Sequence, residues 1–402
     1  MLRRSDLVVL AAPLVVGTVL GLLRRPTGRP EVDLTASADS LLEGQATSAS
    51  VTLASADTLD VVAVDLRVGR GFVGLSGRPE RCVSVQPGER RDVTLDLRSI
   101  RWGRHQVGPA IVQAVGAHGL LRQGPSVSGV VTATTLPLRE GFEATDTVPH
   151  AQGVVGLHRS RRPGEGTELT GVRAFSVGDR LHRIHWPVSL RTGELHVTAT
   201  LSDRDTDVTL VLDTRYDIGF SDGIDGAASS LDVTVRAAAS VAEHYLRHGD
   251  RVGLIDLGQA IRQVRPGGGR AHLVRLLDVL LDAQPARGSG LTANVALSEV
   301  APGSLVLLLS PLVGENSLAR AAALGRAGHA VLVVDTLPAD ARPPRRSEWT
   351  QLAWRVWLLE REVDVARLAE LGVPVVPWRG AGSLDLVLQD ISRAAAAPKA
   401  LR

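Results

Sequence analysis

Residues 207–213 read DVTLVLD, an almost entirely apolar run that ends in an aspartate. Three further runs of the same kind follow it: RVGLIDL (251–257), SLVLLLS (304–310) and AVLVVD (330–335). Helix-like stretches at about 227–247 and in SLARAAALGRAG (317–328) separate these runs. Strands that are apolar on both faces and alternate with helices are typical of a parallel sheet covered on both sides. The pattern predicts a doubly wound, Rossmann-like α/β domain over 206–397, with any binding site at the carboxyl ends of its strands.

The C-terminal part of this domain continues the alternation of helix and strand. A charged helix is predicted at about 349–370, a short strand in VPVVPW (373–378) and a last helix near 383–397. Residues 339–348, ADARPPRRSE, are predicted to form a solvated loop, because they combine prolines with charges. Residues 398–402 are assigned to a tail.

The segment 31–135 has a different pattern, in which apolar and polar residues alternate. Val62, Val64, Leu66 and Val68 would point to one face of a strand, and the residues between them to the other. Turn signals such as GRP and PGE end these runs at short intervals. The pattern predicts a small all-β, Ig-like sandwich, which a connecting segment at 136–205 joins to the α/β domain.

Residues 7–23, LVVLAAPLVVGTVLGLL, form a run of seventeen residues without a charge. As a helix this run would be roughly 25 Å long, against about 30 Å for the hydrocarbon core of a bilayer. Arginines flank both ends, and the run meets Arg-Arg-Pro rather than the small residues of a signal-peptide cleavage site. The pattern predicts one transmembrane anchor within 1–30, in contact with the lipid bilayer, whose orientation the balanced flanking charges leave open.

The charge balance argues against nucleic-acid binding. The net charge is +2, from 45 basic and 43 acidic residues, and Lys399 is the single lysine. The arginines are scattered among nearly as many carboxylates, without the interleaved aromatic residues that stack on bases. The single cysteine, Cys82, can form no internal disulfide, and we expect it to be a half-buried apolar side chain in a strand.

Three short motifs have the letters of a catalytic or binding site but lack its context. His182 and His185 have an H-x-x-H spacing, which aligns only roughly on a helix and has no cysteine or HExxH setting to support zinc. GFSDG around Ser221 does not directly follow a buried strand, as a nucleophile elbow does. RPGGGR (265–270) lacks the Gly-Lys-Ser/Thr ending of a phosphate loop and is predicted to be a turn before a helix. We therefore predict no catalytic residue and no cofactor.

The segment 156–197, GLHRSRRPGEGTELTGVRAFSVGDRLHRIHWPVSLRTGELHV, resembles the signature of the bacterial family called domain of unknown function 58. Its arginine, Gly-Asp pair, Ile-x-Trp and Ser-x-Arg correspond to Arg173, Gly178, Asp179, Ile184, Trp186, Ser189 and Arg191, with Arg183 beside them. The upstream pieces LLEGQ, RWGRHQVGP and HGLL also resemble that family's β-domain. The chain departs from the family in having one N-terminal apolar helix where members often have two, and His185 where an acidic residue is more common.

The resemblance implies a C-terminal α/β domain similar to von Willebrand factor A domains, preceded by the β-sandwich and the transmembrane helix. It also implies a partner, because members are commonly encoded beside a MoxR-type AAA+ ATPase, with membrane transglutaminase-like proteins as frequent neighbours. It implies no activity, because the family has none assigned. Since such ATPases are cytoplasmic, the resemblance favours a single-pass cell-membrane protein with residues 24–402 in the cytoplasm.

Von Willebrand factor A domains bind Mg²⁺ through Asp-x-Ser-x-Ser, completed by a threonine and an aspartate from two further loops. The corresponding positions of this chain hold Asp213, Arg215, Asp217, Leu291 and Ser310. A hard cation is coordinated by carboxylate and hydroxyl oxygens, whereas arginine has no lone pair to give and carries a fixed positive charge. We therefore predict a degenerate site that holds no metal, in which Arg215 forms a salt bridge with Asp213 or Asp217.

Arginines are dense between 158 and 191. Arg159, Arg161 and Arg162 lie in a Gly/Pro-bounded stretch that we expect to be exposed and to face an acidic partner or anionic lipid headgroups. For Arg173 and Arg183 we expect internal pairing with Asp179, and for Trp186 a packing role between segments.

These features together predict a membrane-anchored, non-enzymatic interaction or scaffold protein that works with an AAA+ ATPase in protein assembly or cell-envelope processes. Two alternatives stay open at this point. An exported adhesion or ligand-binding module would show a dependence on divalent cations. A cell-envelope enzyme would depend on Ser221, His182 or His185.

Overall fold

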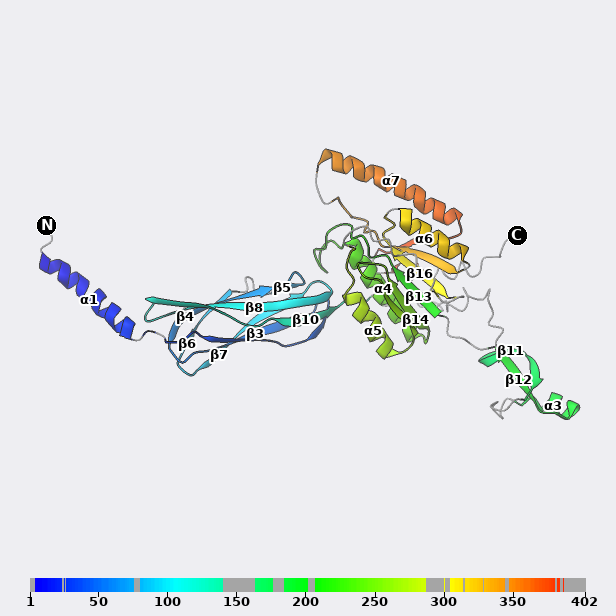
Figure 1. Ribbon diagram of the computed structural model, residues 1–402, viewed down its shortest axis with the longest axis horizontal. Coiled ribbons are helices and arrows are strands. Elements are labelled where there is room, and N and C mark those ends of the chain that lie inside the picture. Colours follow the sequence, from blue (N-terminus) through cyan, green and yellow to red (C-terminus); the bar gives the residue numbers. More distant parts are fainter. Residues whose placement is uncertain are drawn as a thin grey trace. The chain divides into compact units, whose positions relative to one another are not determined.

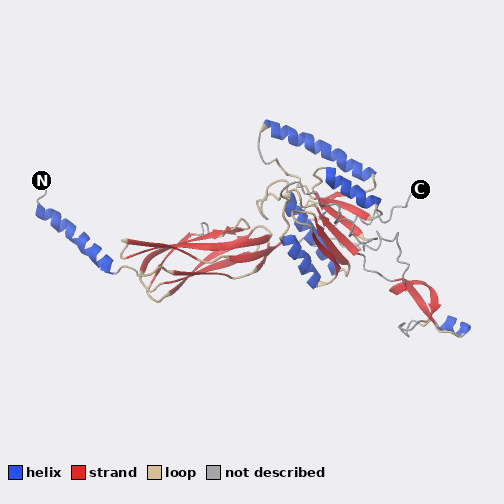
Figure 2. Cartoon of the chain, in the orientation of Figure 1, coloured by secondary structure: helices blue, strands red, loops and turns tan. Residues whose placement is uncertain are grey.

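A computed structural model of the 402-residue chain divides into two compact units. Unit 1 comprises Met1–Leu138, Phe220–Ala228 and Leu280–Asp282, and unit 2 comprises Arg139–Gly219, Ser229–Val279 and Ala283–Arg402. The structure describes residues 4–23, 25, 27–75, 80–139, 163–175, 184–201, 207–286, 300, 304–313, 315–327, 329–343, 347–379, 382–383 and 386. Strands dominate unit 1 apart from one N-terminal helix, whereas unit 2 contains both helices and strands (Figures 1 and 2).

Unit 1 contains two sheets. The four-stranded sheet has the order β1-β3-β7-β5, with β1 Glu31–Ala36, β3 Ala46–Ala54, β7 Arg90–Ser99 and β5 Phe72–Gly74. The six-stranded sheet has the order β2-β10-β8-β4-β6, with β9 paired to β8; its bounds are β2 Ser40–Leu42, β10 Val131–Leu136, β8 Gly103–Gly116, β4 Leu59–Val68, β6 Glu80–Val85 and β9 Leu121–Val127. Residues from both sheets share one apolar core, so this part of the chain is a β-sandwich.

The period-two pattern explains how these strands build their core. Val62, Val64 and Leu66 of β4 are buried, whereas Ala63 and Arg67 on the opposite face of the strand are exposed, as the sequence predicts. Cys82 of β6 corrects the prediction of a half-buried side chain, because it is exposed. It lies on the face of its strand that points away from the core.

A short piece of chain far along the sequence also belongs to unit 1. Arg98 of β7 donates to both carboxylate oxygens of Asp225, at 2.5 and 3.2 Å. The backbone N–H of Ile224 donates to the carbonyl of Ile100 at 2.7 Å. The segment Phe220–Ala228, which contains Ser221, is therefore held by strand β7 and the residue that follows it.

Unit 2 is built around a six-stranded sheet of order β15-β14-β13-β16-β17-β18. Its strands are β13 Asp207–Leu212, β14 Arg251–Asp256, β15 Arg262–Gly267, β16 Leu305–Ser310, β17 Ala330–Asp335 and β18 Val375–Pro377. All neighbouring pairs are parallel except β14 and β15, which are antiparallel. Because five strands run in one direction, their carboxyl ends meet along a single edge of the sheet.

The described part of unit 2 has four helices of eight or more residues beside this sheet: α4 Ser230–Arg247, α5 Arg270–Leu281, α6 Glu315–Arg326 and α7 Glu348–Glu370. The last helix expected near 383–397 lies almost entirely outside the described residues. Helix α4 contacts β13, β14 and β16, and α5 lies on the same side in Figure 1. Helix α6 contacts β17, and α7 contacts α6 and β18. The strands are apolar on both faces because helices cover both faces. Leu324 of α6 and Leu368 of α7 pack with Val211, Leu308 and Val333 of the strands.

A separate antiparallel pair carries the family-like signature. Strands β11 (Pro163–Ala174) and β12 (His196–Leu201) pair with each other, and the short helix α3 (Trp186–Thr192) lies between them in sequence. Ile184 forms an isolated bridge with Val197 at the start of β12. The chain therefore reverses direction through α3, which ends at Gly193 in the left-handed conformation.

The fold class expected from the sequence needs correction. The chain is mixed α/β with a β-rich N-terminal region, and the specific expectation of a von Willebrand factor A-like domain behind a transmembrane helix is wrong. Apolar strands alternating with helices indicate that a parallel sheet forms, but they do not distinguish one named α/β fold from another.

The expected transmembrane anchor and the single-pass location in the cell membrane are also wrong, whereas the bilayer contact of residues 7–23 stays a prediction. The run does form a helix, α1 (Arg4–Leu23), with Pro13 inside it. Among the described residues, however, no helix has both the length and the apolar character that crossing a membrane requires. The uncharged run has seventeen residues, at the lower limit of the length that spans a bilayer, so apolar composition alone was weak ground for a transmembrane helix.

Candidate functional site

Polar side chains stand at the carboxyl end of each long parallel strand of unit 2. Asp213 follows β13, and Asp256, Ser310 and Asp335 are the last residues of β14, β16 and β17. Strands β13, β14, β16 and β17 are consecutive neighbours in the sheet, so these side chains lie along one edge. This edge is where parallel sheets place their ligands, and we treat it as the candidate site.

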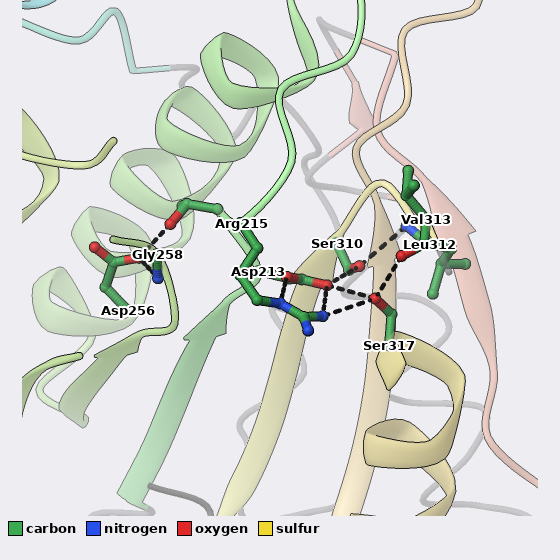
Figure 3. A network of polar contacts seen from close by, with 9 residues as sticks. Asp213, Arg215, Asp256, Gly258, Ser310, Leu312, Val313 and Ser317 are labelled. Carbon is green, nitrogen blue, oxygen red and sulfur yellow. Dashed lines mark hydrogen bonds and ion pairs between the residues drawn. The ribbon is translucent and has the colours of Figure 1, made fainter. Parts of the chain in front are cut away.

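Asp213 is the centre of the polar network at this edge (Figure 3). Arg215 holds it through two parallel hydrogen bonds, from Nε to Oδ1 at 2.7 Å and from Nη2 to Oδ2 at 3.0 Å. The hydroxyls of Ser310 and Ser317 donate to Oδ2 at 2.9 and 2.6 Å. Ser317 lies on α6, so a helix, a strand end and a loop all converge on one carboxylate that is 1% exposed.

The network keeps Asp213 ionised. Burial alone would raise the pKa of its carboxyl, but the hydrogen bonds and charge of Arg215, with the two serine hydroxyls, outweigh burial and lower the pKa below 3.8. A bidentate guanidinium–carboxylate pair is among the stronger polar contacts in proteins, and removing one partner leaves a buried charge uncompensated. Arg215 also lies over the ring of the exposed Tyr216, with 5.5 Å from Cζ to the ring centroid.

The residues present do not fit a divalent cation. Both oxygens of Asp213 are engaged by the Arg215 guanidinium, which stands where a metal would need to be and has the same sign of charge. The salt bridge expected for Arg215 is present, and Asp213 rather than Asp217 is its acid. Asp217 instead accepts a hydrogen bond from the backbone N–H of Leu231 at 3.1 Å. Leu291 lies outside the described residues.

Asp256, at the end of β14, has no directly bonded cation among the described residues, although the charge of Arg262 acts on it. Its Oδ1 accepts hydrogen bonds from the hydroxyl of Thr214 and, at 3.1 Å, from the backbone N–H of Gly258. Burial is the largest influence and raises the pKa of the Asp256 carboxyl above 3.8, against the effect of those two hydrogen bonds. Gly258 is needed here, because a Cβ would stand 2.6 Å from the carbonyl oxygen of Gln284 and would also clash with the Thr214 hydroxyl.

A second guanidinium, that of Arg361, binds the carboxyl end of β17. Arg361 of α7 donates to Oδ1 of Asp335 and, through Nε, to the carbonyl of Pro311 at 3.0 Å. The backbone N–H of Leu337 also donates to Asp335 Oδ1, at 3.0 Å. Arg361 therefore connects α7 to the last residue of β17 and to the first residue after β16.

A third arginine at this edge has no such acceptor. Arg320 of α6 is only 7% exposed, and its Nε and Nη1 have no hydrogen-bond partner within the part of the chain that the structure describes. Burial is the largest influence that lowers the pKa of Arg320, followed by the charge of Arg215; Asp213 and Tyr216 act in the opposite direction. Two guanidinium groups therefore act on one carboxylate, which leaves one positive charge at this edge without a described counterion.

The structure assigns local roles to several signature residues. The buried Ser189 hydroxyl donates to the carbonyl of His185 at 3.0 Å and accepts from the backbone N–H of His196 at 2.9 Å, which joins α3 to β12. Trp186 corrects the expectation of a packing anchor, because it is 57% exposed, and Arg191 is exposed as well. Arg173 lies in β11, without a described side chain. Positions Gly178, Asp179, Arg183, His182, Arg159, Arg161 and Arg162 lie outside the described residues.

Sequence reasoning found Asp213, Arg215 and Ser310 but missed the other members of the network. Asp256 and Asp335 could have been found, because each ends an apolar strand run. Ser317, Arg320 and Arg361 come from helices, and nothing in their local sequence indicates which strand end they reach.

Unit 2 also has a cavity of about 580 Å³, lined by Arg139, Glu243, Leu246, Arg247, Gly269, Arg270 and Leu273. Its one carboxylate, Glu243, is within 3.4 Å of Arg139 and 2.8 Å of Arg247. Because two arginines pair with that carboxylate, the cavity offers no free carboxylate among its lining residues for acid–base chemistry.

Comparison with known families gives a match over part of the chain. The family model described as "Protein of unknown function DUF58" matches residues 171–346, which include the strand-end aspartates and all of α6. The family expected from the signature is therefore confirmed for this part of the chain, and the family's function is unknown.

Two curated relatives are also of unknown function. An uncharacterized protein of Mycobacterium bovis is 27% identical over 197 residues, which cover 47% of this chain and 61% of the relative. An uncharacterized protein of Mycobacterium tuberculosis strain H37Rv matches to the same extent. The chain thus spans less than two thirds of the length of these relatives.

Solved structures match the chain only over short stretches. The CARDB domain of a Pyrococcus furiosus protein is 14% identical and covers 27% of this chain and 94% of its own, with a TM-score of 0.21. The cupredoxin domain of amoB from Nitrosocaldus yellowstonii is 12% identical and covers 31% of this chain and 97% of its own, with a TM-score of 0.21. Both are β-sandwich domains, and neither is a von Willebrand factor A domain. At these TM-scores they carry no argument about function.

Proposed function

We propose that this member of the family of unknown function 58 is a non-enzymatic interaction protein, which binds an acidic group of a partner protein at the carboxyl ends of β13 and β16. The observation that carries this proposal is Arg320, a side chain that is 7% exposed with two nitrogens lacking a described acceptor. A buried, unpaired guanidinium is costly to a fold, so its retention beside the Asp213–Arg215 pair suggests that binding compensates it.

A carboxylate is the ligand that this geometry suits. Two guanidinium groups, those of Arg215 and Arg320, flank Asp213, which can neutralise only one of them. A carboxylate can accept two parallel hydrogen bonds from a guanidinium group, which gives both strength and orientation. Tyr216 next to them is 43% exposed and stacks on Arg215, and exposed tyrosines near arginines are frequent anchors of protein interfaces.

The roles of the acidic residues favour binding over catalysis. Asp213 is held by Arg215 and two serines, Asp335 by Arg361, and Asp256 by Thr214 and Gly258. A general base must be able to reach the proton that it abstracts. Each of these carboxylates instead accepts hydrogen bonds from groups that hold the strand ends in place.

The family resemblance favours a MoxR-type AAA+ ATPase as the partner. The experiment is a crosslinked pull-down of the tagged full chain from its native cells, with and without ATP, followed by binding of the purified partner. Nucleotide-dependent enrichment of an AAA+ ATPase is the expected result. Recovery of transglutaminase-like proteins, other envelope enzymes or extracellular ligands in its place would show that the partner class is wrong.

The variant Arg320→Met tests the site itself. Loss of a buried charge contact across an interface typically costs ~2–5 kcal/mol, so we expect partner affinity to fall at least about 30-fold. The matched control is Arg326→Met, which changes an exposed arginine of the same helix and should leave affinity unchanged. Because Arg320 lacks a described acceptor, its replacement should not lower the free energy of unfolding. Unchanged partner affinity in Arg320→Met would contradict the proposed site.

A further inference from the structure

Helix α7 is apolar on two opposite faces. The inner face packs on unit 2: Val365 and Leu368 join the core cluster with α6 and the strands, and Arg361 reaches Asp335. Trp354 and Trp357 lie on this inner side, half-buried, with ring centroids 4.7 Å apart. These contacts account for one side of the helix.

The outer face has a second apolar row that stays exposed beside the described residues of unit 2. We define the outer row of α7 as Trp349, Leu352, Val356, Leu359 and Val363, which are 81, 55, 48, 63 and 53% exposed. The spacing between consecutive members alternates between three and four residues, which is a heptad pattern with Trp349 at an a position. A single exposed apolar side chain needs no explanation, but five in one heptad row indicate a surface that is covered by another helix.

The residue types in the row specify the helix that would cover it. The a positions include the β-branched Val356 and Val363, and the d positions are Leu352 and Leu359. Valine at a with leucine at d favours parallel, two-stranded coiled coils. We propose that the outer row of α7 pairs with the outer row of α7 from a second copy of this chain, in a parallel two-stranded arrangement.

The charges beside the row complement each other in that arrangement. In a parallel pair, each g position faces the e position five residues later on the other helix. Arg355 (g) then faces Glu360 (e) of the second copy, and Glu362 (g) faces Arg367 (e) of the second copy. All four side chains are exposed, and Arg367 has only a surface contact with Asp364, at 3.2 Å. In an antiparallel pair, only half of these ion pairs between the two copies would form, because Glu360 would face Ala353.

Pairing through α7 requires little reorganisation. The helix has 23 residues, about 34 Å at 1.5 Å per residue, and its inner contacts already hold it folded. The nucleation cost that makes short isolated coiled coils marginal is therefore not incurred on association. Five side chains per copy form a small interface, which corresponds to weak, reversible dimers with a Kd of roughly micromolar size.

The experiment is sedimentation equilibrium of the full chain over roughly 1 to 200 µM, around the expected Kd, in a mild non-ionic detergent that shields the exposed apolar side chains of α1. We expect a monomer–dimer equilibrium. Leu359→Glu places a charge at the centre of the row in both copies and should raise Kd at least about 100-fold. The matched control is Val274→Glu, the same kind of change at a 61% exposed position of α5, and it should leave Kd unchanged.

Charge reversal tests the parallel register. Arg355→Glu or Glu360→Arg alone should weaken the dimer by about 3- to 10-fold, because each creates two like-charge pairs. The double variant should restore the original Kd, because the pairs reform with exchanged signs. In an antiparallel pair, Glu at position 355 would face Glu362, and the double variant would stay weak.

Three results would overturn the inference: a monomer at every concentration, equal Kd for Leu359→Glu and Val274→Glu, or a double variant as weak as the single ones. The inference is independent of the proposed partner site. Arg320→Met should leave self-association unchanged, and Leu359→Glu should leave the unfolding free energy of unit 2 unchanged.

Discussion

The ends of β13 and β14 are neighbouring regions of one sheet edge, and each buries an aspartate, yet the two carboxyl groups are stabilised differently. Asp213 at the end of β13 receives a guanidinium and two hydroxyls, and its pKa is lowered. Asp256 at the end of β14 receives one hydroxyl and one backbone N–H, and burial raises its pKa. The difference shows that burial alone does not set the charge state of a strand-end acid. The presence of a directly bonded cation does.

The largest expected effect comes from removing that cation. Arg215→Met leaves Asp213 buried with only the serine hydroxyls, and breaking a buried ion pair in this way typically costs about 3–5 kcal/mol. The measurement is urea unfolding followed by tryptophan fluorescence, which reports mainly on unit 2 because Trp186, Trp349, Trp354, Trp357 and Trp378 belong to it. Arg247→Met, which removes a 72% exposed arginine from a surface pair with Glu243, is the control and should cost under about 0.5 kcal/mol. Equal losses for the two variants would contradict a structural role for the Asp213–Arg215 pair.

A smaller effect is expected at the other strand end. Gly258→Ala would place a Cβ 2.6 Å from the Gln284 carbonyl oxygen and against the Thr214 hydroxyl that supports Asp256. Overpacking of this kind typically costs about 1–3 kcal/mol, which the same unfolding assay resolves. In Gly268→Ala the nearest atom to the new Cβ is 3.9 Å away, so this control should be close to neutral. A tolerated alanine at 258 would mean that the turn after β14 can move without loss.

The smallest effect, and the one that sharpens the comparison most, is a difference in pH dependence. The raised pKa of Asp256 means that the folded protein binds this proton more tightly than the unfolded chain does. Its contribution to stability is therefore present at low pH and lost as the pH rises through the folded pKa. For Asp213 the pH dependence has the opposite direction. The contribution of Asp213 to folding stability is present above about pH 3.8 and is lost as the pH falls through its lowered pKa.

Asp256→Asn tests this sign, because asparagine keeps an oxygen acceptor for Thr214 and Gly258 but cannot ionise. Relative to the unmodified protein, the variant should gain unfolding free energy as the pH rises from about 4 to about 8. Asp213→Asn should show no such gain, since it removes an acid that is stabilised in its charged form. A constant difference between Asp256→Asn and the unmodified protein would show that Asp256 titrates normally.

Much of the strand framework could be predicted from local sequence, because burial on one or both faces imposes a short period on the residues. Val62, Val64 and Leu66 alternate as a half-buried strand must, and Val208–Leu212 are almost all apolar because both faces of β13 are covered. The pairing of Arg215 with Asp213 could also be predicted, since the two residues are separated by one position in the loop after β13.

The other contacts of the strand-end site, and the surroundings of the helices, depend on tertiary structure that local sequence does not encode. Ser317 reaches Asp213 across about a hundred residues of chain, and Arg361 reaches Asp335 from a helix. The apolar run at 7–23 misled for a related reason, since apolar composition indicates a helix but leaves its surroundings undetermined. Helix α7 was expected as a charged helix, and its second apolar face becomes visible only once the inner contacts are known.

The Arg215 guanidinium has a consequence for regulation. A metal ion at the end of a strand can be released, exchanged or chelated, so a surface built around one responds to the ionic composition of its surroundings. The Arg215 guanidinium, in contrast, is a permanent part of the chain and stays protonated over the whole physiological pH range. The charge arrangement at the end of β13 is therefore constitutive, and the binding that we propose there would not depend on the supply of a cation.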